Sequence, residues 1–217
     1  EHQRAAHAAE RLWESLGSAL ERPPGSSRRL LQLGLVVALG LAGGLSWQAA
    51  HQGWMADQVT GLGEHRRVTL ADGSHLELAP RTRVDIDMQA GRRVLHLYSG
   101  ELFGQGAPDT QRPFEVRAGR GSLRALGTGF DVRREGEHVR MVVTEHTVRV
   151  TLDGDPQTTD VDAGQAVQYG PDGLSRSQPV DVATATAWRR DKLVFNRQPL
   201  GEVLEQLGRY HRGVIWV

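Results

Sequence analysis

The sequence of 217 residues contains no cysteine. Disulfide bonds, thiolate metal sites and thiol nucleophiles are therefore excluded together. The absence does not locate the protein, because a chain without cysteine is compatible with both the cytoplasm and the periplasm.

An excess of charge is also missing. The 26 lysine and arginine residues balance 26 aspartate and glutamate residues, so the chain as a whole has no positive charge with which to recruit a phosphate backbone. The nine histidines include no pair at the i, i+4 spacing of a helical metal site. We therefore predict no direct nucleic-acid partner, no metal and no cofactor.

A conventional catalytic motif is absent as well. The glycine-rich stretches 119–121 and 127–129 do not lie between a strand and a phosphate-binding helix, and no nucleophile elbow or paired-carboxylate arrangement stands out. The sequence thus predicts a protein that is not an enzyme on small substrates. The alternatives are a membrane-anchored periplasmic enzyme and an envelope-binding β domain.

One long hydrophobic segment is present, at residues 30–50, and it contains no charged residue. At about 1.5 Å per residue it spans roughly 31 Å, which matches the hydrocarbon core of a bilayer. Arg28 and Arg29 precede it, whereas no lysine or arginine follows until Arg66, so the positive-inside bias places the N-terminus in the cytoplasm and the C-terminus in the periplasm. We predict a transmembrane helix; a signal peptide and a buried core helix are the alternatives.

Residues 1–21 carry the pattern of an amphipathic helix. Apolar residues recur at spacings of three and four between Ala5 and Leu20, charged residues lie among them, and Pro23 and Pro24 follow. Such a helix either packs within a larger cytoplasmic domain or lies in the groove of a partner. Because the first residue is Glu1 and not methionine, we expect a fragment of a longer protein.

The apolar period changes to two after a polar, glycine-bearing linker at residues 51–63. Val68 and Leu70 precede Asp72-Gly73, and Leu76 and Leu78 follow it, a pattern typical of a β-hairpin. Alternating segments and turn signals continue to residue 180. Residues 64–180 are therefore predicted to form a mainly β domain, an antiparallel β sandwich or a solenoid-like fold.

The pattern changes again over residues 181–217. A strand is expected at Lys192–Phe195, a helix at Pro199–Tyr210 and a second strand at Val214–Val217. The end of the chain is thus predicted to be a partial βαβ piece.

Beyond these patterns, several segments occur in the order and style of the FecR family of regulators. They are Arg67–Ser74, Ser99–Phe103, Arg112–Val116, Leu126–Arg133, Ala163–Val167 and Ala187–Phe195, with Pro199-Leu200 after them. The chain resembles this family over nearly its whole length.

The resemblance implies a relay in cell-surface signalling, typically for an iron-siderophore. The signalling domain of a TonB-dependent outer-membrane receptor would touch the periplasmic part, and the cytoplasmic tail would control an extracytoplasmic-function sigma factor. Residues 1–29 would be the end of the sigma-binding domain, with Leu12, Trp13 and Leu16 at the contact. The receptor-binding surface would lie within Trp188–Val217. The expected location is the bacterial inner membrane, crossed in a single pass.

The resemblance also implies a chemical step, because some family members cleave themselves at a Gly-Thr bond. Gly127-Thr128 matches that bond. The threonine hydroxyl would attack the preceding carbonyl, which glycine leaves uncrowded, and water would open the resulting ester. The alternative interpretation of these residues is a glycine-containing bulge at a sheet edge.

Overall fold

The structure is a computed structural model that describes residues 56–125, 127, 129–155, 158–196 and 199–210. The described strands are β1 (Gln58–Val59), β2 (Arg66–Thr69), β3 (His75–Leu78), β4 (Arg83–Gln89), β5 (Arg92–Gln105), β6 (Phe114–Ala118), β7 (Gly121–Ala125), β8 (Gly129–Glu135), β9 (His138–Val143), β10 (Thr147–Leu152), β11 (Thr158–Asp162), β12 (Gln165–Gly170), β13 (Gly173–Leu174) and β14 (Gln178–Pro179). The helical segments are α3 (Val182–Ala185), the 3₁₀ turn η1 (Ala187–Arg190) and α4 (Leu200–Leu207).

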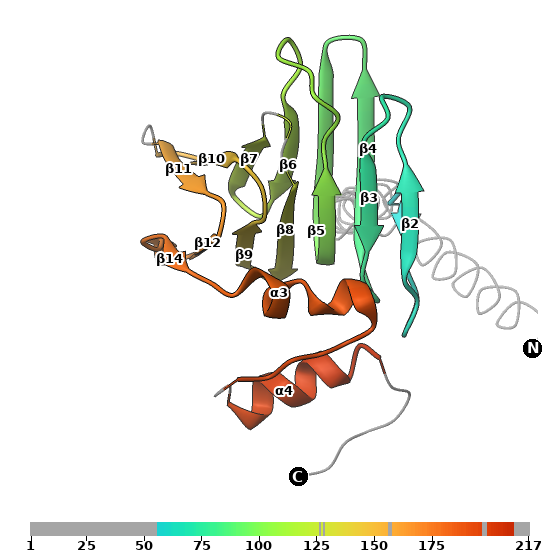
Figure 1. Cartoon of the computed structure of the whole chain (residues 1–217), viewed down its shortest axis with the longest axis vertical. Helices are drawn as coiled ribbons and strands as arrows, with labels where there is room; N and C mark the ends of the chain where they lie inside the picture. The colour runs from blue at the N-terminus through green and yellow to red at the C-terminus, as the bar shows by residue number, and fades with distance from the viewer. Residues whose placement is uncertain (1–55, 126, 128, 156–157, 197–198, 211–217) are drawn as a thin grey trace, which may run out of the picture. The chain divides into compact units, whose positions relative to one another are not determined.

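The strands form two sheets that share the long strand β5 and curl around a common core (Figure 1). The first sheet has the order β1-β4-β5-β6-β7-β10-β11, and the second has the order β2-β3-β5-β8-β9-β12, with β13 and β14 paired to β12. The prediction of a mainly β fold is confirmed. The prediction of antiparallel pairing needs one correction: β6 runs parallel to β5, because the connection 106–113 returns the chain to the start of β5.

Strand β5 passes from one sheet to the other at Gly100. The residues before it pair with β4 and β6, and Gly100 itself begins the pairing with β8. Its φ of 92° is a conformation that side-chain-bearing residues rarely adopt, and a Cβ atom there would lie 2.5 Å from the Cα atom of Thr82. Glycine is therefore required at the point where the two sheets join.

The predicted hairpin is confirmed, and it shows how the alternating pattern builds the core. Strand β2 pairs with β3 so that Val68 lies opposite Leu76, with Asp72-Gly73 in the connection. Leu76 is 1% exposed, and inward-facing side chains of the other strands join it in a single cluster. At the centre, the rings of Phe114 and Phe130 meet edge to face at 6.3 Å.

A buried arginine ties three parts of the β domain together. Arg93, which is 1% exposed, forms an ion pair with Asp72 of the hairpin turn at 2.9 Å. Its guanidinium also donates to the carbonyls of Ala107 and Arg112, on the connection between β5 and β6. Burial alone would raise the pKa of Asp72, but hydrogen bonds from Ser74 and Arg93 hold that pKa below its usual value. The charge is thus paired and hydrogen-bonded, as a buried charge requires.

Two expected features differ in the structure. The predicted linker 51–63 contains strand β1, which pairs with β4, so the β domain begins earlier than residue 64. The strand predicted at Lys192–Phe195 is wrong, because these residues are irregular. Asp191 adopts a left-handed conformation after η1, and the Lys192 N–H donates to the carbonyl of Ala187, so the chain turns back on itself instead of extending.

The predicted helix in this region is confirmed as α4. Three predictions concern residues outside those that the structure describes. They are the strand at Val214–Val217, the cytoplasmic location of residues 1–29 and the transmembrane helix at residues 30–50. Within the part of the chain that the structure describes, no helix is both long and apolar enough to cross a membrane.

Candidate functional site

The C-terminal segment, residues 181–210, lies against the second sheet and is held there by Trp188. It begins with α3, whose first turn is capped by the Asp181 carboxylate accepting from the N–H groups of Ala183 and Thr184. The turn η1 then directs Trp188 into the β domain, where only 4% of the residue stays exposed. Trp188, with Ala79, Phe103 and Leu193, forms a small apolar cluster distinct from the main core.

A pair of carboxyl groups receives the tryptophan. The indole N–H of Trp188 donates to Asp131 of β8 at 2.9 Å, and Asp131 is itself hydrogen-bonded to Glu101 on the neighbouring strand β5. Burial, together with the closeness of the two carboxyls, raises the pKa of Asp131 well above its usual value, and burial also raises the pKa of Glu101. The pair therefore retains a proton under conditions in which exposed carboxyls are ionised.

A raised carboxyl pKa is also a property of catalytic acids, so the accessibility of this pair decides its role. Asp131 is 3% exposed, and the hydrogen bond from Trp188 occupies one of its oxygens. A substrate does not reach this group while the C-terminal segment is in place. The geometry assigns the pair to the docking of Trp188.

A second contact lies one residue further along the segment. Arg189 pairs with Glu77 of β3, and its guanidinium stacks over the ring of Phe103 at 3.5 Å from the centroid. The Nε atom of Arg189 is buried, and the structure records no hydrogen-bond partner for it among the described residues. This contact adds a charged clamp beside the Trp188 anchor.

The end of the segment is joined to the start of the β domain. The ring of His65 lies between those of Trp188 and Tyr210, with centroid distances of 5.9 and 5.7 Å. The Gly63 N–H donates to the carbonyl of Arg209, and the Arg209 side chain pairs with Glu135. The C-terminal segment therefore contacts strands or connections that are distant in the sequence.

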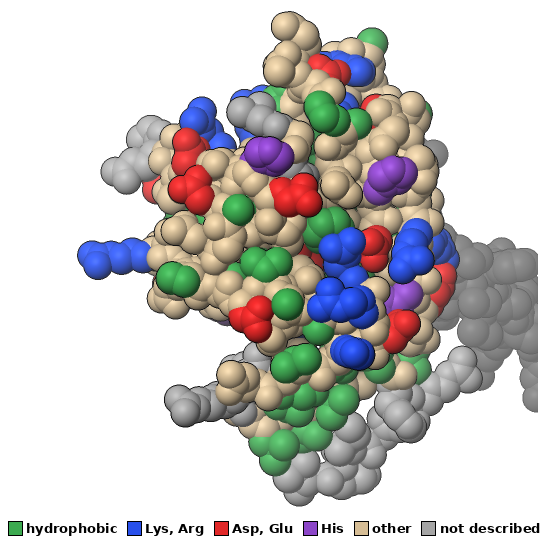
Figure 2. Space-filling view, in the orientation of Figure 1, with side chains coloured by type: hydrophobic (Ala, Val, Ile, Leu, Met, Phe, Trp, Pro, Cys, Tyr) green, Lys and Arg blue, Asp and Glu red, His purple; other side chains and the backbone are tan. Residues whose placement is uncertain are grey.

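Helix α4 leaves part of its apolar face uncovered. Its apolar residues Leu200, Val203, Leu204 and Leu207 share one side of the helix, and Leu200 is 58% exposed. Figure 2 shows hydrophobic side chains gathered on the surface where α4 lies. Val194, in the irregular stretch before the helix, is 47% exposed. Both residues belong to the stretch Trp188–Val217, for which receptor binding is predicted.

The candidate cleavage bond lies in the connection between β7 and β8. Gly127 has a φ of 79°, and a Cβ atom at this position would lie 3.4 Å from the Cα atom of Pro108. Thr128 lies outside the described residues. On its other side, the Gly129 carbonyl accepts hydrogen bonds from the N–H and hydroxyl groups of Thr144 and from the Glu145 N–H. The backbone on both sides of the bond is thus in close contact with the β domain.

Some of the residues at this site are recognisable in the sequence, and others are not. Trp188 belongs to a quoted motif, but Asp131 and Glu101 look like ordinary outward-facing residues of alternating strands. Their partnership depends on strand register, for which no local signal exists. The sigma-contact residues Leu12, Trp13 and Leu16 lie outside the described residues.

The carboxyl pair predicts a specific pH dependence. Because the folded pKa of Asp131 is raised, its contribution to stability is fully present below the ordinary carboxyl pKa of about 4 and is lost as the pH rises through the folded pKa. Asp131→Asn keeps an oxygen acceptor for Trp188 and removes the titration. As the pH rises, we expect the free energy of unfolding of the variant to increase relative to that of the wild type. The increase should be about 1.4 kcal/mol for each unit by which the folded pKa of Asp131 is raised. Urea denaturation of both proteins between pH 4 and pH 8 measures this difference, and parallel curves would contradict it.

The β domain is similar to known proteins. A family model described as FecR protein matches residues 56–149. Two crystal structures of a Parabacteroides distasonis protein assigned to the anti-sigma factors are similar to the chain, each with a TM-score of 0.63 and 26% identity, over 70% of this chain and 73% of the other. No curated protein matches the chain.

Proposed function

Because a FecR family model matches residues 56–149, we propose that this chain is a FecR-family, single-pass inner-membrane anti-sigma regulator. The cytoplasmic tail binds an extracytoplasmic-function sigma factor. The β domain lies in the periplasm and responds to the signalling domain of a TonB-dependent outer-membrane receptor. The typical ligand of such a receptor is an iron-siderophore.

The observation that carries this proposal is the FecR match over residues 56–149, a part of the β domain. The similarity to a protein assigned to the anti-sigma factors supports the same role. The uncharged segment 30–50 supports the membrane crossing that such a relay needs, because arginines directly precede it and none follows within fifteen residues.

The C-terminal segment suits contact with a receptor. The exposed Leu200 and Val194 offer apolar surface to a partner, while Trp188 fixes the segment to the β domain. A partner that covers α4 therefore acts on the C-terminal segment, which the small apolar cluster of Trp188 holds separately from the main core. Such an element can respond to binding without unfolding the β domain.

Co-purification of the full chain, solubilised in detergent, with the sigma factors of a bacterial host tests the proposal. We expect one extracytoplasmic-function sigma factor to be recovered and to be lost when Leu12, Trp13 and Leu16 are replaced together by alanine. Glu14→Ala, on the same predicted helix, is the matched control and should retain the sigma factor. Recovery of no sigma factor by a folded, membrane-inserted chain would contradict the proposal.

The same preparation tests self-cleavage, which we propose as a single-turnover step at Gly127-Thr128. The Thr128 hydroxyl oxygen bonds to the Gly127 carbonyl carbon, the C–N bond breaks, and the hydroxyl proton passes to the released amine. Water then hydrolyses the ester to the Gly127 carboxylate and the free Thr128 hydroxyl. Intact-mass measurement should find fragments that end at Gly127 and begin at Thr128, and a single uncut species for Thr128→Ala. An uncut wild type would reject the step without affecting the sigma-binding test.

A further inference from the structure

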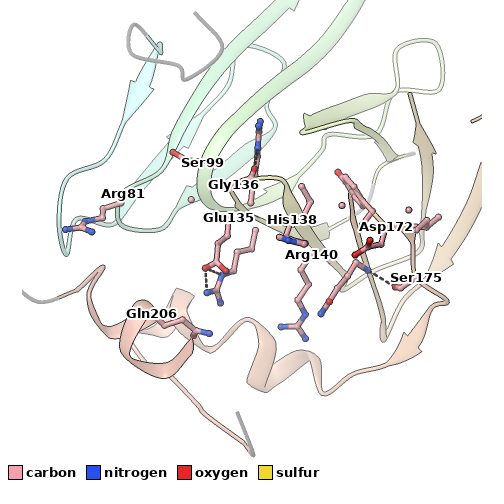
Figure 3. A pocket seen from close by; sticks show the side chains of 18 of the residues that line it. Arg81, Ser99, Glu135, Gly136, His138, Arg140, Asp172, Ser175 and Gln206 are labelled. Atoms are coloured by element: carbon pink, nitrogen blue, oxygen red, sulfur yellow. Dashed lines mark hydrogen bonds and ion pairs between the residues drawn. The ribbon is translucent and has the colours of Figure 1, made fainter. Parts of the chain in front are cut away.

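An open groove of about 1160 Å³ lies between the second sheet and helix α4. Figure 3 shows Arg81 at one end and Ser175 at the other, with Glu135, Arg140 and Gln206 between them. The groove is larger than the roughly 300–1,000 Å³ of typical small-ligand pockets and is partly open to solvent. Its volume suits an extended chain better than a compact small molecule.

The lining of the groove has an excess of positive charge, although the whole chain has none. Five arginines line it, against two carboxylates: the arginines are Arg81, Arg133, Arg134, Arg140 and Arg209, and the carboxylates are Glu135 and Asp172. Both Arg133 and Arg209 pair with the same carboxylate, that of Glu135. For Arg81 and Arg140 the structure records no ion pair among the described residues, although the charge of Arg140 acts on the buried Asp131 from a distance. The positive charge of the groove is therefore only partly compensated within the described chain.

Arg134 is one of the lining arginines whose charge is only partly compensated. Its guanidinium is half-buried and donates to two backbone carbonyls, those of Gly136 and Leu97. Among the described residues no carboxylate forms an ion pair with it, and Glu137 supports its charge only from a distance. Burial lowers the pKa of Arg134, which reflects the cost of holding its charge away from water. An incoming carboxylate would relieve that cost, because a buried charge is stabilised by a charged hydrogen-bond partner.

We propose that this groove, which we call the arginine groove, binds an extended acidic peptide segment of a partner protein. Arginine presents planar forks that match carboxylates, and several arginines along one groove suit several acidic side chains along one peptide. Ser99, Gln168, Ser175 and Gln206 supply uncharged groups for the peptide backbone. A single-stranded nucleic acid fits less well, because it needs exposed aromatic rings for stacking. Two aromatic rings belong to the lining residues: that of Tyr169 is buried, with its hydroxyl donating to the carbonyl of Ala118, and that of His138 is exposed. One exposed imidazole gives a single stacking surface, whereas a single strand stacks successive bases on several rings.

The groove depends on the C-terminal segment, because Gln206 and Arg209 form part of its wall. A peptide that binds both walls stabilises the docked segment, and release of the segment removes one wall. Binding and docking are therefore linked in both directions. This linkage does not require the sigma factor or the self-cleavage step, so its test is independent of theirs.

Fluorescence anisotropy of a labelled peptide of alternating glutamate and glycine, titrated with the full chain in detergent, tests the proposal. We expect saturable binding at about 50 mM salt that weakens at about 500 mM salt. The double replacement Arg81→Glu and Arg140→Glu should weaken binding at least about tenfold, through lost pairing and added repulsion. Arg140→Gln is a milder second variant, should the reversal impair folding. Trp188→Ala, outside the groove, should also weaken binding by releasing one wall.

The matched control is Arg149→Glu, on β10 of the first sheet, where the arginine is exposed and pairs with Asp160. It reverses the charge of one arginine outside the groove, as the double replacement does at each of two positions within it, and should bind the peptide as the wild type does. Equal affinity for all variants would reduce the interaction to general electrostatic attraction and overturn the proposal. No binding at low salt would also overturn it, as would tighter binding of an oligothymidine of the same charge, which would point to a nucleic acid.

Discussion

Replacing Arg93 with methionine is expected to lower the free energy of unfolding of the β domain by about 3–5 kcal/mol, the usual effect of removing one partner of a buried ion pair. The reason is that Asp72 and the carbonyls of Ala107 and Arg112 lose their donor while they remain partly or wholly shielded from water. Methionine keeps much of the side-chain volume, so the loss reports mainly on polar pairing. Urea denaturation of the full chain in detergent, followed by the β-sheet circular dichroism signal, measures it.

Two comparisons identify the cause of this loss. Arg149→Met removes an exposed arginine whose partner Asp160 is also exposed, so it should change stability little. Because the pKa of Asp72 is lowered, the contribution of its ion pair is fully present above the ordinary carboxyl pKa of about 4 and is lost as the pH falls through the folded pKa. The difference between wild type and Arg93→Met should therefore shrink in acid. A difference that stays constant down to pH 2 would assign the effect to packing instead.

Trp188→Ala is expected to release the C-terminal segment while the β domain stays folded. Removing a buried tryptophan costs about 3–5 kcal/mol. The cluster with Ala79, Phe103 and Leu193 then loses its largest side chain, and the ion pairs of Arg189 and Arg209 are left to hold the segment. The main core does not include these residues, so its strands keep their packing. Limited digestion with trypsin should then cut faster after Arg189 and Arg190, at the centre of the released segment.

Val194→Ala is the matched control for this experiment. It is in the same segment, but Val194 is 47% exposed and belongs to neither core cluster, so digestion should proceed as in the wild type. Once the segment is free, Asp131 and Glu101 meet water, and the pKa of both should return toward ordinary carboxyl values. Unchanged digestion of Trp188→Ala would contradict the assignment of Trp188 as the anchor.

The C-terminal region shows why part of the fold could not be predicted. Helix α4 was predicted because its apolar residues recur at helical spacing, a signal contained in eight neighbouring residues. The strand predicted at Lys192–Phe195 had a comparable local pattern, yet these residues are irregular. A strand needs a partner at the right distance, and whether one is present depends on the tertiary structure.

Some residues of the candidate site could also be predicted from the sequence, and others could not. The motif around Trp188 and the glycine of the candidate cleavage bond are visible in the sequence, because tryptophan and glycine have few roles at such positions. The carboxyl pair is not visible, since Asp131 lies 57 residues from Trp188 and alternates with apolar neighbours like any solvent-facing residue. The arginine groove is hidden too, because a chain with 26 basic and 26 acidic residues gives no sign of where each charge gathers.

The amino-acid sequence by itself determined the family resemblance, the mainly β character and the Asp72-Gly73 hairpin, because these depend on residues that are close together along the chain. Only the tertiary structure decided that β5 serves both sheets, that Arg93 meets Asp72, and that Asp131 receives Trp188. Those contacts follow from strand register and from the direction in which each connection returns, and both are set by packing the whole core at once.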